Sequence, residues 1–266
     1  GETGKRVLEL AGIEDVLSRT DGIAVVNLRL PAVYGSTFAG KLAILSKLPA
    51  FLRPIAFQCL ASLKPTVNLK LVAAAILNST RDEISTETIV SDKQNGNLVY
   101  QTTKRVLDIT FALFVIVILW WVLLGAWLAV KLTSPGPGIF AQQRVGKGGL
   151  PFTCYKFRTM KLGTKEAGTH EVTADSVTAV GRVLRKTKID ELPQVWNILK
   201  NELSLVGPRP CLPGQRELML ARSNLGVLDE IGGITGWAQI RNVDMSDPER
   251  LAKLDAKYLA LRTIPL

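Results

Sequence analysis

The chain has 266 residues, enough for one large domain or two modest ones with real cores. Hydrophobic residues make up 47% of it. That fraction is high for a soluble protein but low for a protein with many membrane spans, so we expect one membrane element on a soluble body. The formal net charge of +10 leaves three classes of partner: nucleic acid, anionic lipid or a phosphorylated substrate.

Cysteine and histidine usage argues against several kinds of site. Cys59, Cys154 and Cys211 stand far apart without a CxxC pair, so we expect neither a disulfide framework nor a zinc site, and a cytosolic context is simpler. The single histidine, His170, lies in a polar stretch and is expected in a solvated loop. Catalysis by a Ser-His or Cys-His pair is therefore not expected.

The N-terminal third has the pattern of a small α/β segment followed by a linker. We expect a β-branched strand at 23–30 closed by Pro31 and the turn Tyr34-Gly35, a helix at 69–77 capped by Asn68, and a strand at 88–90. These elements define a first domain over residues 1–91. Residues 92–103 are polar and contain Asn95-Gly96, which predicts a linker.

A membrane helix is predicted over residues 104–132, because residues 109–130 carry no charge and match the length that spans a bilayer core. Basic residues flank this run on both sides, which fits a helix that dips into one leaflet and returns better than a simple span. Trp120 and Trp121 lie in the middle of the run and weakly support the dip. No proline stands there to break the helix, and a straight anchor helix is the alternative.

The sequence pattern changes at residue 133, and residues 133–266 are expected to form the body of the protein. Apolar residues at helical spacing over 189–199 predict a helix, and Pro193 is tolerated only in a first turn, so the helix must begin close to Asp190. Asp190 and Glu191 would then lie at the positive end of a helix, which also favours bound phosphate. The alternative is that the two carboxylates merely cap this helix.

The surroundings of this carboxylate pair favour phosphate chemistry over simple capping. Upstream stand four basic residues, Arg182, Arg185, Lys186 and Lys188. Downstream, Pro208 and Pro210 restrict the backbone around Arg209, which suits an arginine positioned for bidentate phosphate binding. Carboxylates beside so many cations make sense if a divalent metal and a pyrophosphate complete the charge balance.

Several short motifs in this region resemble those of the bacterial sugar transferase family, small membrane-bound polyprenyl-phosphate sugar-phosphate transferases. They cover about residues 104–262 in the family's order. The matches are Lys104-Arg105-x-x-Asp108, Ser134-Pro135-Gly136-Pro137, Gln143-Arg144-Val145-Gly146, Tyr155-Lys156-Phe157-Arg158-Thr159-Met160, Asp190-Glu191-Leu192-Pro193-Gln194, Trp196-Asn197-Ile198-Leu199-Lys200, Val206-Gly207-Pro208-Arg209-Pro210 and Gly233-Ile234-Thr235-Gly236-Trp237-Ala238-Gln239.

The resemblance implies transfer of a sugar-1-phosphate from a UDP-sugar to polyprenyl (undecaprenyl) phosphate, the step that initiates polysaccharide or glycan assembly. Asp190 would be the nucleophile that forms a phosphosugar-aspartyl intermediate and releases UMP. Glu191, with Asp190, would hold Mg²⁺ as the cofactor. The residues implied in substrate binding are Arg185, Pro208, Arg209, Pro210, Lys156, Arg158, Arg144 and Gln239. For Lys156 and Arg158, ordinary surface charge is an equal alternative.

The resemblance also implies a localisation and partners. The protein is expected at the bacterial inner (cytoplasmic) membrane with its catalytic domain facing the cytoplasm. Its expected partners are the UDP-sugar, polyprenyl phosphate and membrane lipids, with a homodimer left open and no nucleic acid, because the basic groups cluster with carboxylates. The expected fold is α+β: a mainly helical, membrane-associated transferase body with one re-entrant or spanning hydrophobic helix, plus the small N-terminal α/β part.

Other features depart from that family's pattern. Residues 1–91 resemble a remnant of the C-terminal part of an extended short-chain dehydrogenase, the nucleotide-sugar epimerase type, without its glycine-rich turn or Tyr-x-x-x-Lys pair. Trp120-Trp121 replace the Ser-Pro that usually bends the membrane helix, and Ile231-Gly232 replace an Arg-Pro. The alternative function is therefore a catalytically weak or inactive membrane-bound relative that binds nucleotide or partner proteins. Which sugar is used cannot be deduced from the sequence.

The last predicted helix begins at the cap and first-turn pair Asp247-Pro248. Leu251, Leu254, Tyr258 and Leu261 would form one apolar stripe along it. Such a helix can lie on anionic lipid or pack on the core of the protein, and we favour packing on the core.

Overall fold

The computed structural model describes residues 26–36, 38, 40–79, 86–164 and 176–265. The chain divides into two compact units, one formed by residues 1–100 with 260–266 and the other by residues 101–259. Helices dominate, and the strands form small two-stranded sheets. Two expectations, a solvated loop at His170 and the start of the first strand at residues 23–25, lie outside the described residues.

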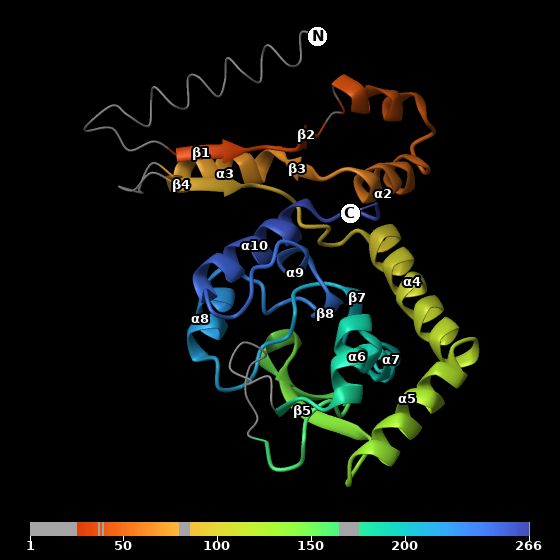
Figure 1. The fold of residues 1–266 in the computed structure, drawn as a ribbon. Coiled ribbons are helices and arrows are strands. Elements are labelled where there is room, and N and C mark those ends of the chain that lie inside the picture. Colours follow the sequence, from red (N-terminus) through yellow and green to blue (C-terminus); the bar gives the residue numbers. More distant parts are fainter. Residues whose placement is uncertain (1–25, 37, 39, 80–85, 165–175, 266) are drawn as a thin grey trace, which may run out of the picture. The chain divides into compact units, whose positions relative to one another are not determined.

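The first unit is a small α/β arrangement, as predicted (Figure 1). Strand β1 pairs in parallel with β4, and β2 pairs in parallel with β3. Asn68 accepts a hydrogen bond from the backbone N–H of Lys70 at 2.9 Å, which confirms its capping role. The chain does not simply turn after Pro31, because a second strand forms there. The elements are β1 Val26–Arg29, β2 Ala32–Tyr34, η1 Gly40–Lys47, α2 Arg53–Leu63, β3 Thr66–Asn68, α3 Leu69–Ser79 and β4 Thr86–Ile89.

The apolar run forms two helices, α4 Leu98–Val117 and α5 Trp120–Thr133, which meet at an angle of 63° (Figure 1). No single helix in the described ranges is long and apolar enough to cross a membrane, whereas this bent pair qualifies by length and composition. The straight anchor helix is therefore wrong. Helix α4 begins at Leu98, so the end of the expected linker is helical.

The bend needs no proline because the hydrogen-bond ladder widens just before Trp120. The N–H of Leu119 lies 3.2 Å from the carbonyl oxygen of Val115 and 3.4 Å from that of Phe114, one residue further back. Such a locally widened turn is a recognised cause of helix kinks. Leu119 itself leaves the helical region, with φ −101° and ψ 16°. The two tryptophans therefore begin a new helix, as their unusual place in the run suggested.

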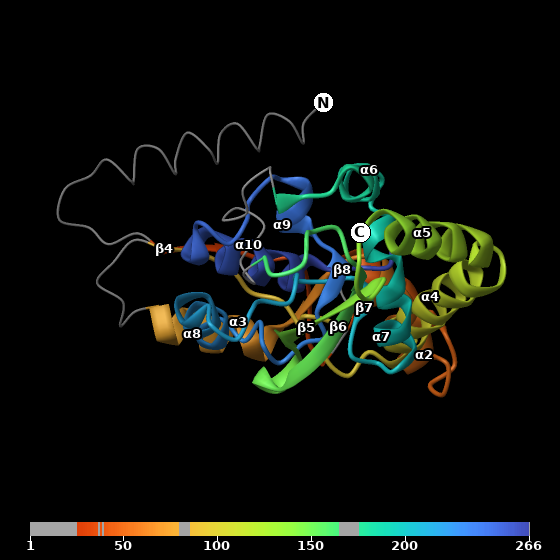
Figure 2. The same cartoon turned by 60° about the horizontal axis from the view of Figure 1, so that its bottom comes forward.

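The second unit is built around the antiparallel hairpin of β5 and β6, with the parallel pair β7 and β8 nearby in the fold (Figure 2). Ala112 and Val115 of α4 pack with Phe152 of β6 and Ile198 of α7 in its main core cluster. Its further elements are β5 Ile139–Val145, η2 Lys147–Gly149, β6 Pro151–Phe157, α6 Ala179–Thr187, η5 Ile189–Gln194, α7 Val195–Leu199, β7 Ser204–Val206, α8 Arg216–Asn224, β8 Gly233–Thr235, α9 Trp237–Ile240 and α10 Pro248–Leu261.

Polar side chains of α4 fasten the bent helix pair to the body. The Asp108 carboxylate accepts hydrogen bonds from the Ser204 hydroxyl at 3.0 Å and from the Leu205 N–H at 2.8 Å. Lys104 donates to the Val206 carbonyl at 2.9 Å, and Arg105 donates to the Ile198 carbonyl at 2.7 Å. The Lys-Arg-x-x-Asp pattern is therefore a structural attachment that fixes where the apolar helices leave the body.

Helix α10 begins as predicted. Asp247 accepts a hydrogen bond from the Arg250 N–H at 3.1 Å, and Pro248 is its first residue. Leu251 and Tyr258 are buried, and the Tyr258 ring meets the Trp237 ring edge-on. The helix therefore packs on the core of its own protein, the alternative favoured from its sequence.

Candidate active site

Asp190 and Glu191 lie in a tight turn between two helices. Helix α6 ends at Thr187, and Lys188 takes a left-handed conformation with φ 60° that stops it. The chain then forms the 3-10 helix η5, which contains both carboxylates and Pro193, before α7 begins at Val195. A helical segment thus begins close to Asp190, as expected, but it is a 3-10 turn, because the left-handed residue before it and the proline within it prevent a continuous α-helix.

Burial separates this carboxylate pair from an ordinary helix cap. Asp190 and Glu191 are only 8% and 9% exposed, whereas acidic residues are rarely buried unless they are paired. No side chain caps η5 or α7 in the described structure. The Oδ1 atom of Asp190 is buried without a hydrogen-bond partner there. The capping alternative is therefore wrong for this pair.

Arg209 is the partner of Glu191. Its guanidinium donates to Oε2 of Glu191 at 3.2 Å and to Oε1 at 2.5 Å, and it also reaches the Ile234 carbonyl at 3.2 Å. Two other buried arginines hold the surrounding backbone: Arg222 donates to the Arg209 carbonyl at 2.8 Å and Arg144 to the Pro210 carbonyl at 3.0 Å. Arg209 is therefore held in a fixed position, as the two neighbouring prolines predicted.

The pKa values of the two adjacent carboxylates are shifted in opposite directions. Burial alone would raise the pKa of Glu191, but the hydrogen bonds and charge of Arg209 outweigh it and lower that pKa to about 2. Burial and the neighbouring charge of Glu191 raise the pKa of Asp190 above its ordinary value. Glu191 is thus a permanently ionised partner of an arginine, and Asp190 is a more basic carboxylate with an unused oxygen. Such divergence is typical of catalytic pairs.

Two further cations act on this pair. The Nζ atom of Lys156 lies 3.7 Å from Oε1 of Glu191, and burial together with the charge of Arg209 lowers the pKa of Lys156 to about 8. Lys156 is therefore not an ordinary surface charge. Arg185 donates to the Thr159 hydroxyl at 2.9 Å, and its charge opposes the rise in the pKa of Asp190.

Arg158 stands apart from this group. It follows β6 and is buried, and it donates to the Ser134 carbonyl in the turn after α5 at 2.8 Å. Its Nη1 atom would lie 2.4 Å from a Cβ atom added to Gly136. It supports the Ser-Pro-Gly-Pro turn, and its buried Nε and Nη1 atoms have no hydrogen-bond partner among the described residues.

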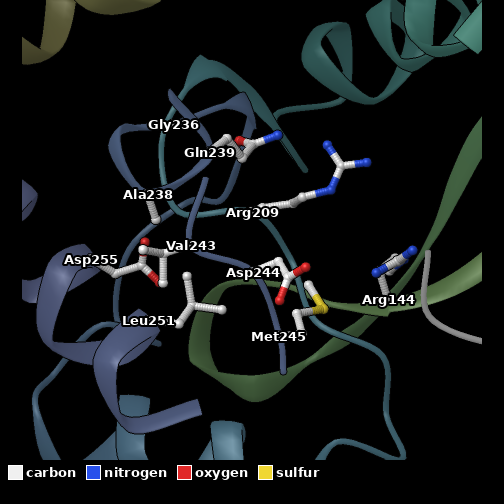
Figure 3. Close-up of a pocket in the computed structure, with 10 residues that line it drawn as sticks. All are labelled: Arg144, Arg209, Gly236, Ala238, Gln239, Val243, Asp244, Met245, Leu251 and Asp255. Carbon is white, nitrogen blue, oxygen red and sulfur yellow. The ribbon is translucent and has the colours of Figure 1, made fainter. Parts of the chain in front are cut away.

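A pocket adjoins Arg209 and contains Gln239 (Figure 3). Gly236 shapes it, because a Cβ atom there would lie 2.3 Å from the Gly207 carbonyl oxygen, and only a glycine allows this approach. The lining residues are Arg144, Arg209, Gly236, Ala238, Gln239, Val243, Asp244, Met245, Leu251 and Asp255. Arg144 and Gln239, both predicted from the resemblance, are thus brought together with Arg209.

The sequence did not reveal two supporting residues. Arg222 forms a buried ion pair with Asp255 at 2.6 Å while it holds the Arg209 backbone. Asn197 is fully buried, accepts from the Tyr155 N–H at 3.2 Å and donates to the Thr153 carbonyl at 2.7 Å. It thereby fixes β6, and with it Lys156, against α7. Asn197 falls within a quoted motif, which was the one available signal, whereas nothing in the sequence pairs Arg222 with Asp255.

The carboxylate pair fits a magnesium ion whose other ligands come from a substrate. No group of three or more His, Cys, Asp or Glu side chains in the described ranges could hold a metal alone. Mg²⁺ usually takes one or two carboxylates and completes its shell with water and substrate phosphates. Asp190 offers its unpartnered Oδ1. Glu191 keeps lone pairs beside Arg209, because a carboxylate has about four acceptor positions.

The chain thus combines a bent apolar helix pair, which suits a membrane by length and composition, with a buried site of carboxylates and fixed cations. A family model described as "Bacterial sugar transferase" matches residues 99–266, and the chain belongs to this family. The match starts after residues 1–91, so their resemblance to epimerases stays a prediction.

Two relatives illustrate the similarity. Over 146 residues (53% of the chain), 43% are identical to the UDP-glucose:undecaprenyl-phosphate glucose-1-phosphate transferase of Caulobacter vibrioides. Over 160 residues (56% of the chain), 44% are identical to the UDP-N-acetylgalactosamine-undecaprenyl-phosphate N-acetylgalactosaminephosphotransferase of Aeromonas hydrophila. The chain spans 54% and 37%, respectively, of the length of these relatives.

Proposed function

We propose that this protein transfers a sugar-1-phosphate from a UDP-sugar to undecaprenyl phosphate and so initiates assembly of a polysaccharide. The observation that carries this proposal is Asp190, a buried carboxylate with an unpartnered oxygen and a raised pKa beside a fixed Glu191–Arg209 pair. The names of the relatives supply the donor and acceptor classes, and they differ in the sugar. The sugar is therefore left open.

In the first step an oxygen of Asp190 attacks the phosphorus that carries the sugar. A bond forms between that oxygen and phosphorus, and the bond from phosphorus to the bridging oxygen of the pyrophosphate breaks. UMP leaves with the electron pair. An ionised carboxylate needs no general base to act as a nucleophile, and the raised pKa of Asp190 makes it a stronger base than an ordinary aspartate.

In the second step an oxygen of undecaprenyl phosphate attacks the same phosphorus. The bond from phosphorus to Asp190 breaks, so the aspartate is regenerated as a carboxylate and a lipid-linked pyrophosphoryl sugar is released. Lys156, Arg185 and Arg209 bind the phosphate oxygens around the reacting phosphorus. Because Arg209 is held by hydrogen bonds on both its side chain and its backbone, little reorganisation is needed as charge develops.

Mg²⁺ is proposed as the cofactor, held by Glu191 and Asp190. When bound, it would offset negative charge on the pyrophosphate. Glu191 keeps Arg209 in position through the two hydrogen bonds described above.

The bent pair of α4 and α5 is proposed to insert into the cytoplasmic leaflet of the bacterial inner membrane, with the body facing the cytoplasm. Its inner face packs on the body through Ala112, Val115, Ala126 and Val130. Its outer face exposes large apolar side chains, including Phe114, Val117, Trp120, Trp121 and Leu132. So many exposed large apolar side chains are unfavourable in water, and a membrane there would keep the lipid acceptor near the site.

The proposed activity should depend on pH through the charge of Lys156. Its pKa is lowered to about 8, so the cation is lost as the pH rises through that value, and kcat/KM for the UDP-sugar should fall above about pH 8. Lys156→Arg should keep kcat/KM level to about pH 9, because arginine remains charged. A pH profile of both proteins tests this. A fall near pH 8 that persists in Lys156→Arg assigns the titration to another group.

The direct test of the proposal is UMP release from a panel of UDP-sugars by the full chain in nanodiscs, with Mg²⁺ and undecaprenyl phosphate. We expect release with at least one donor, dependent on Mg²⁺. Labelled UMP should also exchange into the UDP-sugar without any lipid acceptor, because the aspartyl intermediate forms reversibly. Failure of all donors with folded, membrane-bound protein would favour the inactive relative that binds nucleotide.

A further inference from the structure

Helix α2 of the first unit (Figure 1) has an exposed apolar side. Four exposed residues at helical spacing lie along that side: Leu52, which is the N-cap, and Ile55, Cys59 and Leu63 within the helix. The opposite side holds α2 to its unit, because the Phe57 ring centroid lies 4.6 Å from that of Tyr34 and Ala61 is buried. A surface helix of a soluble protein normally exposes polar residues, so α2 departs from that pattern.

The turn before α2 continues this apolar exposure. Phe51 is 75% exposed, and Ile44 of η1 is 63% exposed. Arg53 closes the turn, because its guanidinium donates to the Leu48 carbonyl at 2.8 Å and to the Ser46 carbonyl at 2.9 Å. Phe51 is therefore held in its exposed position. We call Ile44, Phe51 and the four α2 residues the α2 surface, and exposed apolar side chains gathered in this way mark contact with a protein or a membrane.

The charge around the α2 surface has a single sign. Residues 22–81 contain neither aspartate nor glutamate, although the whole chain has 23 such residues. Lys47, at the end of η1, and Lys64, just after α2, are both exposed. A surface that combines exposed apolar side chains with cations matches an anionic lipid layer, because headgroup phosphates attract the cations while the acyl boundary accepts the apolar groups.

Two observations favour a bilayer over a second copy of the chain as the partner of this surface. A two-fold interface pairs the same patch on both copies, so it would bring like charges together. The first unit is also tethered to the bent helix pair, because its boundary at Tyr100 lies within α4. The uncharged run of α4 starts at Ile109, about 14 Å further along the helix axis. Insertion of the bent pair therefore keeps the first unit close to lipid.

We propose that the α2 surface docks on anionic lipid headgroups of the leaflet that α4 and α5 enter, as a second membrane contact of the chain. This inference rests on the proposed insertion of the bent pair but not on the transferase activity. Phe51, Ile55 and Leu63 enter the boundary between headgroups and acyl chains, as in helices that lie on a membrane. Lys47 and Lys64 contact the lipid phosphates.

Cys59 allows a direct measurement of this docking. It lies on the α2 surface, whereas Cys154 and Cys211 are buried, so a fluorophore can be attached to Cys59 of the full chain alone. The labelled chain is placed in nanodiscs that contain a lipid with a doxyl quencher near its headgroup. We expect strong quenching in nanodiscs rich in phosphatidylglycerol and a large loss of quenching in phosphatidylcholine.

Reversal of the two lysine charges tests the electrostatic part. The double variant Lys47→Glu with Lys64→Glu should lower the ratio of docked to undocked label at least about twentyfold, because each lysine near an anionic surface contributes about fivefold. Arg216→Glu is the matched control, since Arg216 is an exposed residue of the second unit, and it should leave the quenching unchanged. Both lysines are exposed, so Tm should also stay at the wild-type value.

Three outcomes would overturn the inference. Quenching that is equal in both lipids and in the double variant would show that the fluorophore enters the bilayer by itself. A label that is never quenched, on a chain retained in the nanodisc, would exclude docking and leave the insertion of α4 and α5 intact. Concentration-dependent shielding of the label in detergent without lipid would assign the α2 surface to a second copy. UMP release from the same nanodiscs reports on the transferase activity separately.

Discussion

Asp190→Asn should lower UMP release by at least about a thousandfold, the scale of loss when a nucleophile is removed. Asparagine has nearly the same shape but its amide oxygen does not attack phosphorus, so neither half of the reaction can proceed. Exchange of labelled UMP into the UDP-sugar should disappear to the same extent. Both measurements use the full chain in nanodiscs with the best donor.

The same substitution should leave the protein as stable as the wild type or slightly more stable at neutral pH. The pKa of Asp190 is raised by burial and by Glu191, so its ionised form favours unfolding once the pH exceeds its ordinary pKa. The neutral amide removes this unfavourable charge, so Tm should stay level or rise by roughly a few degrees.

Asp247→Asn is the matched control for Asp190→Asn. Asp247 caps α10, and asparagine caps helices about as well as aspartate, so activity and Tm should both stay near wild type. If Asp190→Asn lost stability in proportion to activity, the role of Asp190 would be structural. If it retained a tenth of the activity, the nucleophile would be another group.

Local features of the chain were predictable because each depends on neighbouring residues. Asn68 and Asp247 cap helices as their side chains and positions required. The uncharged run was long enough to identify a membrane element, but its bend depends on how Phe114 and Val115 share the N–H of Leu119. That geometry has no proline or glycine signature, so the sequence left the straight and the re-entrant helix open.

In the candidate site, too, some features were predictable from neighbouring residues and others were not. The sequence placed Asp190 and Glu191 together and showed that Arg209 was constrained, because those facts concern adjacent residues. It could not show that Arg209 pairs with Glu191, or that Arg222 and Asp255 pair beneath it. Those contacts are set by tertiary packing. Arg158 is a further example, because nothing in its motif showed that it would donate to the Ser134 carbonyl.

Arg209→Lys should lower UMP release about a hundredfold, on the scale of losing one preorganised donor to a charged transition state. Lysine keeps the charge but cannot make the two parallel hydrogen bonds to Glu191 while also reaching the Ile234 carbonyl. Arg209→Gln should remove the activity and also destabilise the fold by about 3 kcal/mol at pH 7, because Glu191 then loses its hydrogen-bonded partner and keeps only the more distant Lys156. The matched control is Arg216→Gln, because Arg216 is an exposed arginine on α8.

The pH dependence of unfolding distinguishes the loss of the Glu191–Arg209 ion pair from a simple loss of packing at Arg209. The pKa of Glu191 is lowered to about 2 from 4.5. The resulting stabilisation is present above pH 4.5 and is lost as the pH falls toward 2. In Arg209→Gln burial is opposed only by the charges of Lys156 and Lys188, so that pKa should be higher than in the wild type, and acidification should shrink the difference from wild type. Urea unfolding of both proteins between pH 7 and pH 4 measures that difference. A difference that stays constant would mean that Arg209 acts through packing alone, because its effect on the charge of Glu191 should depend on pH.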